Sequence, residues 1–101
     1  MSLHHFISEE SLDLMHIIQN KSNLSQRQIA NEIGFSLGKV NYCLKALLDI
    51  GFIKMNNFKT SNQKLKYTYI LTPKGTQQKA IITKKFIAKK IQEYEKLMKY
   101  V

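Results

Sequence analysis

The sequence is short of several residues on which common protein classes depend. Its single cysteine, Cys43, excludes an intramolecular disulfide and a cysteine-based zinc cluster. Four glycines and one proline exclude a collagen-like or linker-like chain. Apolar runs such as Leu47-Leu48 hold only a few residues, whereas a membrane-spanning helix needs roughly 20, and the N-terminus has no signal-peptide core. We therefore expect a cytoplasmic protein, not bound to membranes, with one globular core that packing alone stabilises.

Acidic residues are scarce as well, and their distribution along the chain is uneven. The formal net charge is +9, from sixteen Lys and Arg against seven Asp and Glu. Residues 1–50 carry a net charge of −1, whereas residues 51–101 hold twelve lysines and two acids, with no acid before Glu93. Lysines without counter-charges repel one another, and a polyanion relieves that repulsion. The pattern favours nucleic acid as the partner; lysines that only solubilise the surface, or that attract an anionic membrane, are the alternatives.

The sequence also lacks the patterns on which enzymes are built. It has no glycine-rich phosphate loop, no paired carboxylates in an expected cleft and no nucleophile motif. Its three histidines, His4, His5 and His16, lack the spacing and the acidic companions of metal ligands. We therefore expect neither catalysis nor a metal or other cofactor.

Local signals predict three helices in the first half of the chain. Three serines are each preceded by an apolar residue and followed four positions later by another, a pattern typical of a helix N-cap. These candidate N-caps are Ser8, Ser25 and Ser36. The helices that they begin are expected over residues 9–21, 26–33 and 37–50. Gly34 ends the second helix and Gly51 the third, since glycine readily adopts the left-handed conformation that follows many helices.

The periodicity changes after Gly51 from that of a helix to that of a strand. Residues 52–58 are strand-like, and residues 65–71 alternate between apolar and polar positions. The apolar face of the second segment consists of Leu65, Tyr67, Tyr69 and Leu71. A polar and basic segment separates the two strands, so we expect a hairpin with an exposed tip. The alternation predicts that Tyr67 and Tyr69, with Phe58, pack the hairpin against the core; the alternative is that they stack on bases.

The last helix is expected to run from Pro73 almost to the C-terminus, roughly 40 Å at 1.5 Å per residue. Apolar residues recur in it at spacings of 7, 4, 3, 4 and 3, a heptad seam that only Lys84 interrupts. The seam residues, which we expect to form a homodimer interface, are Ala80, Ile87, Ile91, Tyr94, Met98 and Val101. The alternative is one broad apolar face that covers the domain's own core. Ile82, Phe86 and Leu97 lie off the seam, where they can pack on the first helix or on a second chain.

Residues 24–51 carry the spacing of a helix-turn-helix. Ala30, Gly34 and Val40 stand at offsets of 0, 4 and 10. A small residue lets two helices approach, glycine makes the turn, and a β-branched residue fills the gap between the helices. The segment Leu44-x2-Leu47-x3-Gly51-Phe52-Ile53 continues as an amphipathic helix that ends at glycine and enters a strand. Followed by a basic hairpin, this arrangement predicts a DNA-binding unit.

With these features the sequence resembles the winged helix-turn-helix of the MarR family of bacterial transcriptional regulators. Leu47-x3-Gly51-Phe52-Ile53 is similar to the family's recognition-helix exit, and Leu71-Thr72-Pro73-Lys74-Gly75 to its Leu-Thr-x-x-Gly at the exit of the wing. The length and the basic last helix are similar to those of the short MarR-like regulators associated with bacterial exopolysaccharide gene clusters. Full-length members have additional terminal helices that build a dimer interface and an effector pocket, whereas this chain keeps one long terminal helix.

The resemblance implies a mainly α fold with a small β-hairpin. A winged helix-turn-helix DNA-binding domain is expected over residues 1–72 and a long dimerisation helix over residues 73–101. The implied function is that of a homodimeric transcriptional regulator that binds double-stranded DNA sequence-specifically, with the third helix in the major groove and the basic wing on the backbone or in the minor groove. A winged-helix protein–protein interaction module and a nonspecific nucleic-acid binder are the alternatives.

The residues expected to contact DNA come from three segments. At the start of the second helix, where free N–H groups attract a phosphate, they are Ser25, Gln26, Arg27 and Gln28. On the third helix they are Ser36, Leu37, Lys39, Asn41, Tyr42 and Lys45. Among these, Asn41 suits adenine and the lysines suit phosphates or guanine. On the hairpin they are Lys54, Lys59, Lys64 and Lys66. The competing interpretation is that these are polar faces that only solvent contacts.

Overall fold

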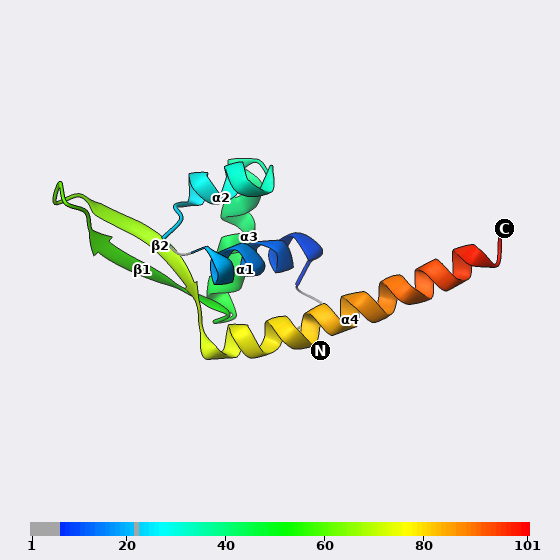
Figure 1. The fold of residues 1–101 in the computed structure, drawn as a ribbon. Helices are drawn as coiled ribbons and strands as arrows, with labels where there is room; N and C mark the ends of the chain where they lie inside the picture. The colour runs from blue at the N-terminus through cyan, green and yellow to red at the C-terminus, as the bar shows by residue number, and fades with distance from the viewer. Residues whose placement is uncertain (1–6, 22) are drawn as a thin grey trace.

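Figure 1 shows the computed structural model, which describes residues 7–21 and 23–101. Within these residues the elements follow in the order α1 (Glu9–Asn20), α2 (Gln26–Ile33), α3 (Leu37–Asp49), β1 (Ile53–Lys59), β2 (Leu65–Leu71) and α4 (Pro73–Met98). The first five elements begin and end within one residue of the bounds predicted from the sequence. The predicted fold class, mainly α with a small hairpin and a long last helix, is confirmed. His4 and His5 lie outside the described residues.

The three predicted serine caps begin the first three helices. Ser8 and Ser36 each accept a hydrogen bond from the backbone N–H three residues further on, both at 3.1 Å. Ser25 and Gln28 form a capping box, in which each side chain accepts a hydrogen bond from the other residue's backbone N–H. Gly34 ends α2 in the left-handed conformation, with φ at 81°. These contacts pair backbone groups that a helix end otherwise leaves free, so the local sequence fixes where the helices begin.

Helices α1 to α3 enclose the hydrophobic core together with the base of the hairpin. Val40, Leu44 and Leu47 of α3 are buried, and Cys43 lies beside them with 5% of its surface exposed. The other fully buried large apolar side chains are Leu14, Met15, Ile29, Phe52, Ile53 and Ile82. The core thus draws on α1, α2, the junction between α3 and β1, and α4.

Strands β1 and β2 pair antiparallel, with Ile53 opposite Leu71 at the base of the hairpin. The prediction of packing against the core is wrong for Tyr67, which like Leu65 is 49% exposed, and the side chain of Phe58 lies outside the described part of the structure. The reason is that the hairpin projects beyond the helices (Figure 1), whereas Tyr69 and Leu71 at the base of β2 reach the core. The outer half of the hairpin is a ribbon with no helix behind it.

A tight corner joins the end of α3 to the starts of β1 and α4. The Thr72 N–H donates to the carbonyl of Phe52 at 3.0 Å, and the Thr72 hydroxyl donates to the carbonyl of Gly51 at 2.6 Å. The same hydroxyl caps α4 by accepting from the Gly75 N–H at 3.0 Å. A Cβ on Gly75 would lie 1.9 Å from the Phe52 carbonyl oxygen. The glycine of the Leu71-Thr72-Pro73-Lys74-Gly75 motif is therefore required by a close backbone approach.

Polar contacts at Lys79 and Lys90 fasten α4 to α1. The Lys79 ammonium lies 3.0 Å from Nδ1 of His16 and also donates to the side chain of Gln19. Lys90 forms an ion pair with Glu9 at 2.9 Å, and this contact raises the pKa of Lys90. Because these pairs flank the apolar contact between the two helices, the direction in which α4 leaves the domain is fixed.

Beyond Lys90, α4 extends away from the rest of the protein (Figure 1), which measures 60 Å along its longest axis. Ile82 is buried and Phe86 packs against the core, as predicted. The exposed fraction is 53% for Ile87, 51% for Ile91 and 64% for Tyr94. The alternative that the seam covers the domain's own core is therefore wrong. The dimer interface and the division of the chain after residue 72 stay predictions. No described helix combines the length and the apolar character needed to cross a bilayer.

Candidate nucleic-acid interface

Helices α2 and α3 are joined as the helix-turn-helix spacing predicts. Ala30 is 7% exposed where the two helices approach, and Val40 is fully buried between them. Gly34 makes the turn with a positive φ, a conformation that other residues adopt only under strain. This geometry directs the opposite side of α3 outward.

The outward side of α3 carries four of the six residues that were predicted for DNA contact on this helix. Tyr42 is 77% exposed and Leu37 43%, and Asn41 and Lys45 are exposed beside them. The Asn41 amide donates to the side chain of Gln26 at 3.4 Å, and the Gln26 amide donates to the backbone carbonyl of Leu37 at 3.5 Å. These contacts bridge α2 and α3, so the Asn41 amide is held at the surface with its other hydrogen-bonding positions available.

The four residues at the start of α2 that were predicted to contact DNA differ in how available their side chains are. The capping box occupies the side chains of Ser25 and Gln28, and Gln26 is turned toward α3. The Arg27 side chain is exposed, and the structure gives it no ion-pair partner among the described residues. Because free N–H groups and the helix dipole attract anions at a helix N-terminus, Arg27 is well placed to hold a phosphate there.

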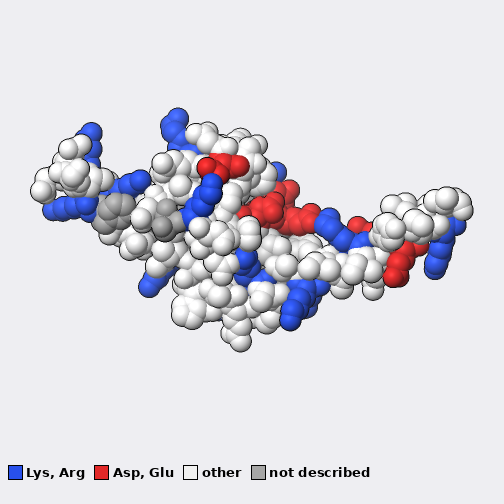
Figure 2. Space-filling model, viewed as in Figure 1, with Lys and Arg blue, Asp and Glu red and all other residues white. Residues whose placement is uncertain are grey.

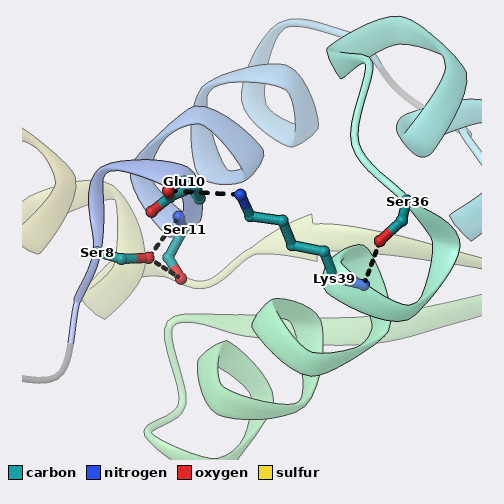
Figure 3. A network of polar contacts seen from close by, with 5 residues as sticks. All are labelled: Ser8, Glu10, Ser11, Ser36 and Lys39. Carbon is teal, nitrogen blue, oxygen red and sulfur yellow. Dashed lines mark hydrogen bonds and ion pairs between the residues drawn. The ribbon is translucent and has the colours of Figure 1, made fainter.

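Lys39 is predicted to contact DNA, but its ammonium lies against α1. It is 3.5 Å from a carboxylate oxygen of Glu10 and 4.5 Å from the centre of the Phe35 ring. Figure 3 shows the Lys39 side chain reaching from α3 to the first turn of α1, while its backbone N–H is capped by Ser36. Glu10 could not be recognised as a member of this site from the sequence, because 29 residues separate it from Lys39.

The hairpin presents its lysines to solvent. Lys54, Lys59 and Lys64 are exposed, and Lys66 is half-buried. Figure 2 shows basic side chains along the hairpin, whereas acidic side chains gather where α1 begins next to α4. No acidic residue occurs in either strand or in the tip. The hairpin is thus a positively charged ribbon without internal compensation.

An open groove of about 740 Å³ separates the hairpin from the N-terminal ends of α2 and α3. Its walls include the half-exposed apolar residues Leu37, Met55, Leu65 and Tyr67, with Arg27 at the rim. Burial at the base of the hairpin raises the pKa of the Tyr69 phenol, which therefore stays neutral at physiological pH. The groove could not be predicted from the sequence. The alternation placed Leu65 and Tyr67 on one face of β2, but it does not encode how far the hairpin projects beyond the helices.

No three His, Cys, Asp or Glu side chains come together as a metal site would require anywhere in residues 7–21 and 23–101. His16 is engaged with Lys79, and Cys43 lies in the core.

The sequence of residues 11–54 matches a family described as winged helix-turn-helix DNA-binding. No curated protein sequence matches the chain. Among solved structures, the chain is similar to a PadR-like transcriptional regulator from Bacillus cereus, with a TM-score of 0.75, 14% identity, and coverage of 87% of this chain and 90% of that one. The family match over residues 11–54 extends from α1 into β1 and therefore contains the whole helix-turn-helix.

Two further structures show the same fold in longer proteins. A MarR/EmrR family regulator from Acinetobacter has a TM-score of 0.67 and 21% identity over 88% of this chain and 61% of that one. Streptococcus pneumoniae FabT, solved in complex with DNA, has a TM-score of 0.64 and 20% identity over 94% of this chain and 64% of that one. The chain thus spans about three fifths of these relatives. An association with exopolysaccharide gene clusters is not shown and stays a prediction. The chain has the winged helix-turn-helix fold that these regulators share, and its residues 11–54, from α1 into β1, match the winged helix-turn-helix DNA-binding family.

Proposed function

We propose that the protein is a homodimeric transcriptional regulator that binds double-stranded DNA sequence-specifically. The observation that carries the proposal is one groove that is bordered by the start of α2 with Arg27, by Leu37 in the first turn of α3, and by the acid-free basic hairpin. A helix of this kind fits the major groove, and a charged hairpin beside it can follow the backbone or the minor groove. Catalysis has no place in this function.

The side chains on that surface divide the work of binding between affinity and specificity. Arg27 and the hairpin lysines neutralise phosphates, which gives affinity but carries no sequence information. The Asn41 amide can donate to and accept from adenine in the bidentate geometry that distinguishes base pairs in the major groove. Tyr42 and Lys45 flank it on the outward side of α3, where Tyr42 can contact a phosphate or a thymine methyl group.

The exposed seam of α4 supports the homodimer. Its large residues, from Ile87 to Met98, are all more than half exposed in a single chain and recur with a heptad period. Contiguous apolar surface of this kind marks an interface in a soluble protein. In a two-fold dimer, two α3 helices would enter successive major grooves about 34 Å apart, so the preferred DNA site would be an inverted repeat. A selection from random DNA that yielded no inverted repeat would contradict this geometry.

The function is tested by fluorescence anisotropy with a duplex from the protein's own upstream region and a scrambled duplex of equal length. Salt is varied from about 50 to 200 mM, because counter-ion release makes phosphate binding strongly salt-dependent. We expect a steep salt dependence and an affinity for the specific duplex at least about 10³-fold higher than for the scrambled one. Equal affinities for duplexes selected from the whole genome would indicate a nonspecific binder. No binding at low salt would favour a protein–protein interaction module.

Two substitutions on this surface are expected to change binding in different ways. Arg27→Ala should weaken binding to specific and scrambled duplexes alike and reduce the magnitude of the log–log salt slope by about 1, since one phosphate contact is lost. Asn41→Ala should instead cost about 1–3 kcal/mol on the specific duplex only, because a base contact is lost. The anisotropy titrations above measure both. Lys99→Ala, at the far end of α4, is the control for net charge and should change neither; an equal loss on all duplexes for Asn41→Ala would exclude base recognition.

A further inference from the structure

Two adjacent acids in the first turn of α1 reach in different directions. Glu9 pairs with Lys90 of α4 at 2.9 Å, and Glu10 pairs with Lys39 of α3 at 3.5 Å. The first contact joins two helices outside the proposed DNA surface. The second involves a cation of α3, the helix that would enter the major groove. Glu10 therefore acts on the proposed site, whereas its neighbour does not.

The start of α1 holds Glu10 in place. Ser8 caps the helix, and its oxygen accepts a hydrogen bond from the N–H of Ser11, a residue that is itself buried. The pKa of the Glu10 carboxyl lies below its usual range, first because its own backbone N–H donates to the carboxylate and then because of Lys39. The carboxylate is therefore charged at physiological pH and presents a fixed anion to the side chain of Lys39 (Figure 3).

Lys39 is held from two sides. Its ammonium lies over the Phe35 ring at 4.5 Å and beside the Glu10 carboxylate at 3.5 Å, while 45% of its side chain stays exposed. A lysine ammonium is a compact point charge, so a DNA phosphate that approaches it competes with the carboxylate for the same donors. The aromatic ring is compatible with either partner, because it contacts the cation through its face.

We propose that Glu10 is a positioning residue that holds Lys39 back from DNA and so lowers the affinity of the protein for duplexes of any sequence. The inference rests on the proposed function. A phosphate must displace the carboxylate before Lys39 contributes to binding, and this cost is the same on every sequence. The cost of displacing the carboxylate does not change the energy of base contacts such as that of Asn41. The contact therefore limits nonspecific occupancy of DNA while leaving the preference among sequences unchanged.

The test compares Glu10→Gln with wild type in anisotropy titrations on the specific and the scrambled duplex. Exposed ion pairs have modest energies, so we expect the affinity for both duplexes to rise by about two- to fivefold, by the same factor. The log–log salt slope should steepen by about 0.9, the contribution of one additional phosphate contact. Lys39→Ala should remove the whole gain in the Glu10→Gln background.

Glu9→Gln is the matched control, because it removes the same charge from the adjacent position without freeing a cation of α3. An equal gain for Glu9→Gln and Glu10→Gln would overturn the inference and leave only a net-charge effect. A gain that persists after Lys39→Ala would overturn it as well. If wild type bound neither duplex at about 50 mM salt, the proposed function would fail first and the inference with it.

A second measurement checks the contact without DNA. The titration of the Glu10 carboxyl, followed by NMR, should give a higher pKa in Lys39→Ala than in wild type, because the removed cation favours the charged carboxylate. An unchanged pKa would show that the two side chains do not interact in solution and would also overturn the inference. Thermal unfolding curves of the variants should stay within a few degrees of wild type, since both side chains are exposed.

Discussion

Gly75→Ala is expected to destabilise the protein by about 3 kcal/mol and to lower Tm by roughly 15 °C. The new methyl carbon would lie 1.9 Å from the Phe52 carbonyl oxygen and 2.8 Å from its carbonyl carbon, far inside van der Waals contact. These are backbone atoms of a buried residue, so no side-chain rotation can relieve the overlap. The corner between α3, β1 and α4 would have to open, with loss of the hydrogen bond from Thr72 to Phe52. Urea and thermal unfolding followed by circular dichroism measure the loss.

Gly38→Ala is the matched control for the same chemical change. Gly38 lies in the first turn of α3, and a Cβ there would meet nothing within 4 Å. Alanine also has a higher helix propensity than glycine, so this variant should be unchanged or about 0.5 kcal/mol more stable. A Gly75→Ala protein as stable as the Gly38→Ala protein would show that the corner is looser than the distances indicate.

Ile91→Glu is expected to convert the dimer into a monomer and to weaken binding to an inverted-repeat duplex by at least about 100-fold. Ile91 lies in the middle of the seam and is 51% exposed in a single chain, so a buried position exists only in the dimer. A carboxylate there would face its own copy across an apolar interface, which is costly without a partner. The loss of affinity follows because two linked half-site contacts become independent. Light scattering gives the mass, and anisotropy gives the affinity.

Gln92→Glu introduces the same charge one residue further along, off the seam on an exposed position. It should leave the mass of the dimer unchanged. Unfolding of Ile91→Glu at high protein dilution should match that of wild-type monomer, because the residue contributes nothing to the core of one chain. If the wild-type protein is monomeric at micromolar concentration, or if the Ile91→Glu protein remains dimeric, the proposal that the α4 seam forms the dimer interface is wrong.

Local signals in the sequence were sufficient for most of the fold. The bounds of α2 follow from Ser25 at one end and Gly34 at the other, because capping and left-handed turns depend on residues only a few positions apart. Ile82 and Phe86 could be separated from the seam of α4 by period alone. The outward residues of α3 followed from the same reasoning, since burial of Val40, Leu44 and Leu47 leaves only one side of the helix for solvent.

Contacts between distant segments could not be predicted in this way. The pairing of Lys39 with Glu10 depends on the angle between α1 and α3, which no spacing within either helix encodes. The exposure of Leu65 and Tyr67 depends on how far the hairpin extends past the helices, although their alternation was evident. Gly75 was recognised only as part of a family-like motif. The physical need for glycine became clear from its approach to Phe52.

The corner at Gly51, Phe52, Thr72 and Gly75 also fixes the position from which α4 leaves the domain. The segment of α4 from Pro73 to Lys90 is held on the domain, and the residues from Ile91 to Met98 extend as a free arm of about 12 Å. Lys74 strengthens the joint by donating to the carbonyl of Ile50, the residue that ends α3. In the proposed dimer, the crossing angle of the two arms therefore sets the distance between the two α3 helices. The half-site spacing that the protein accepts is then a property of the seam, remote from every side chain that touches a base.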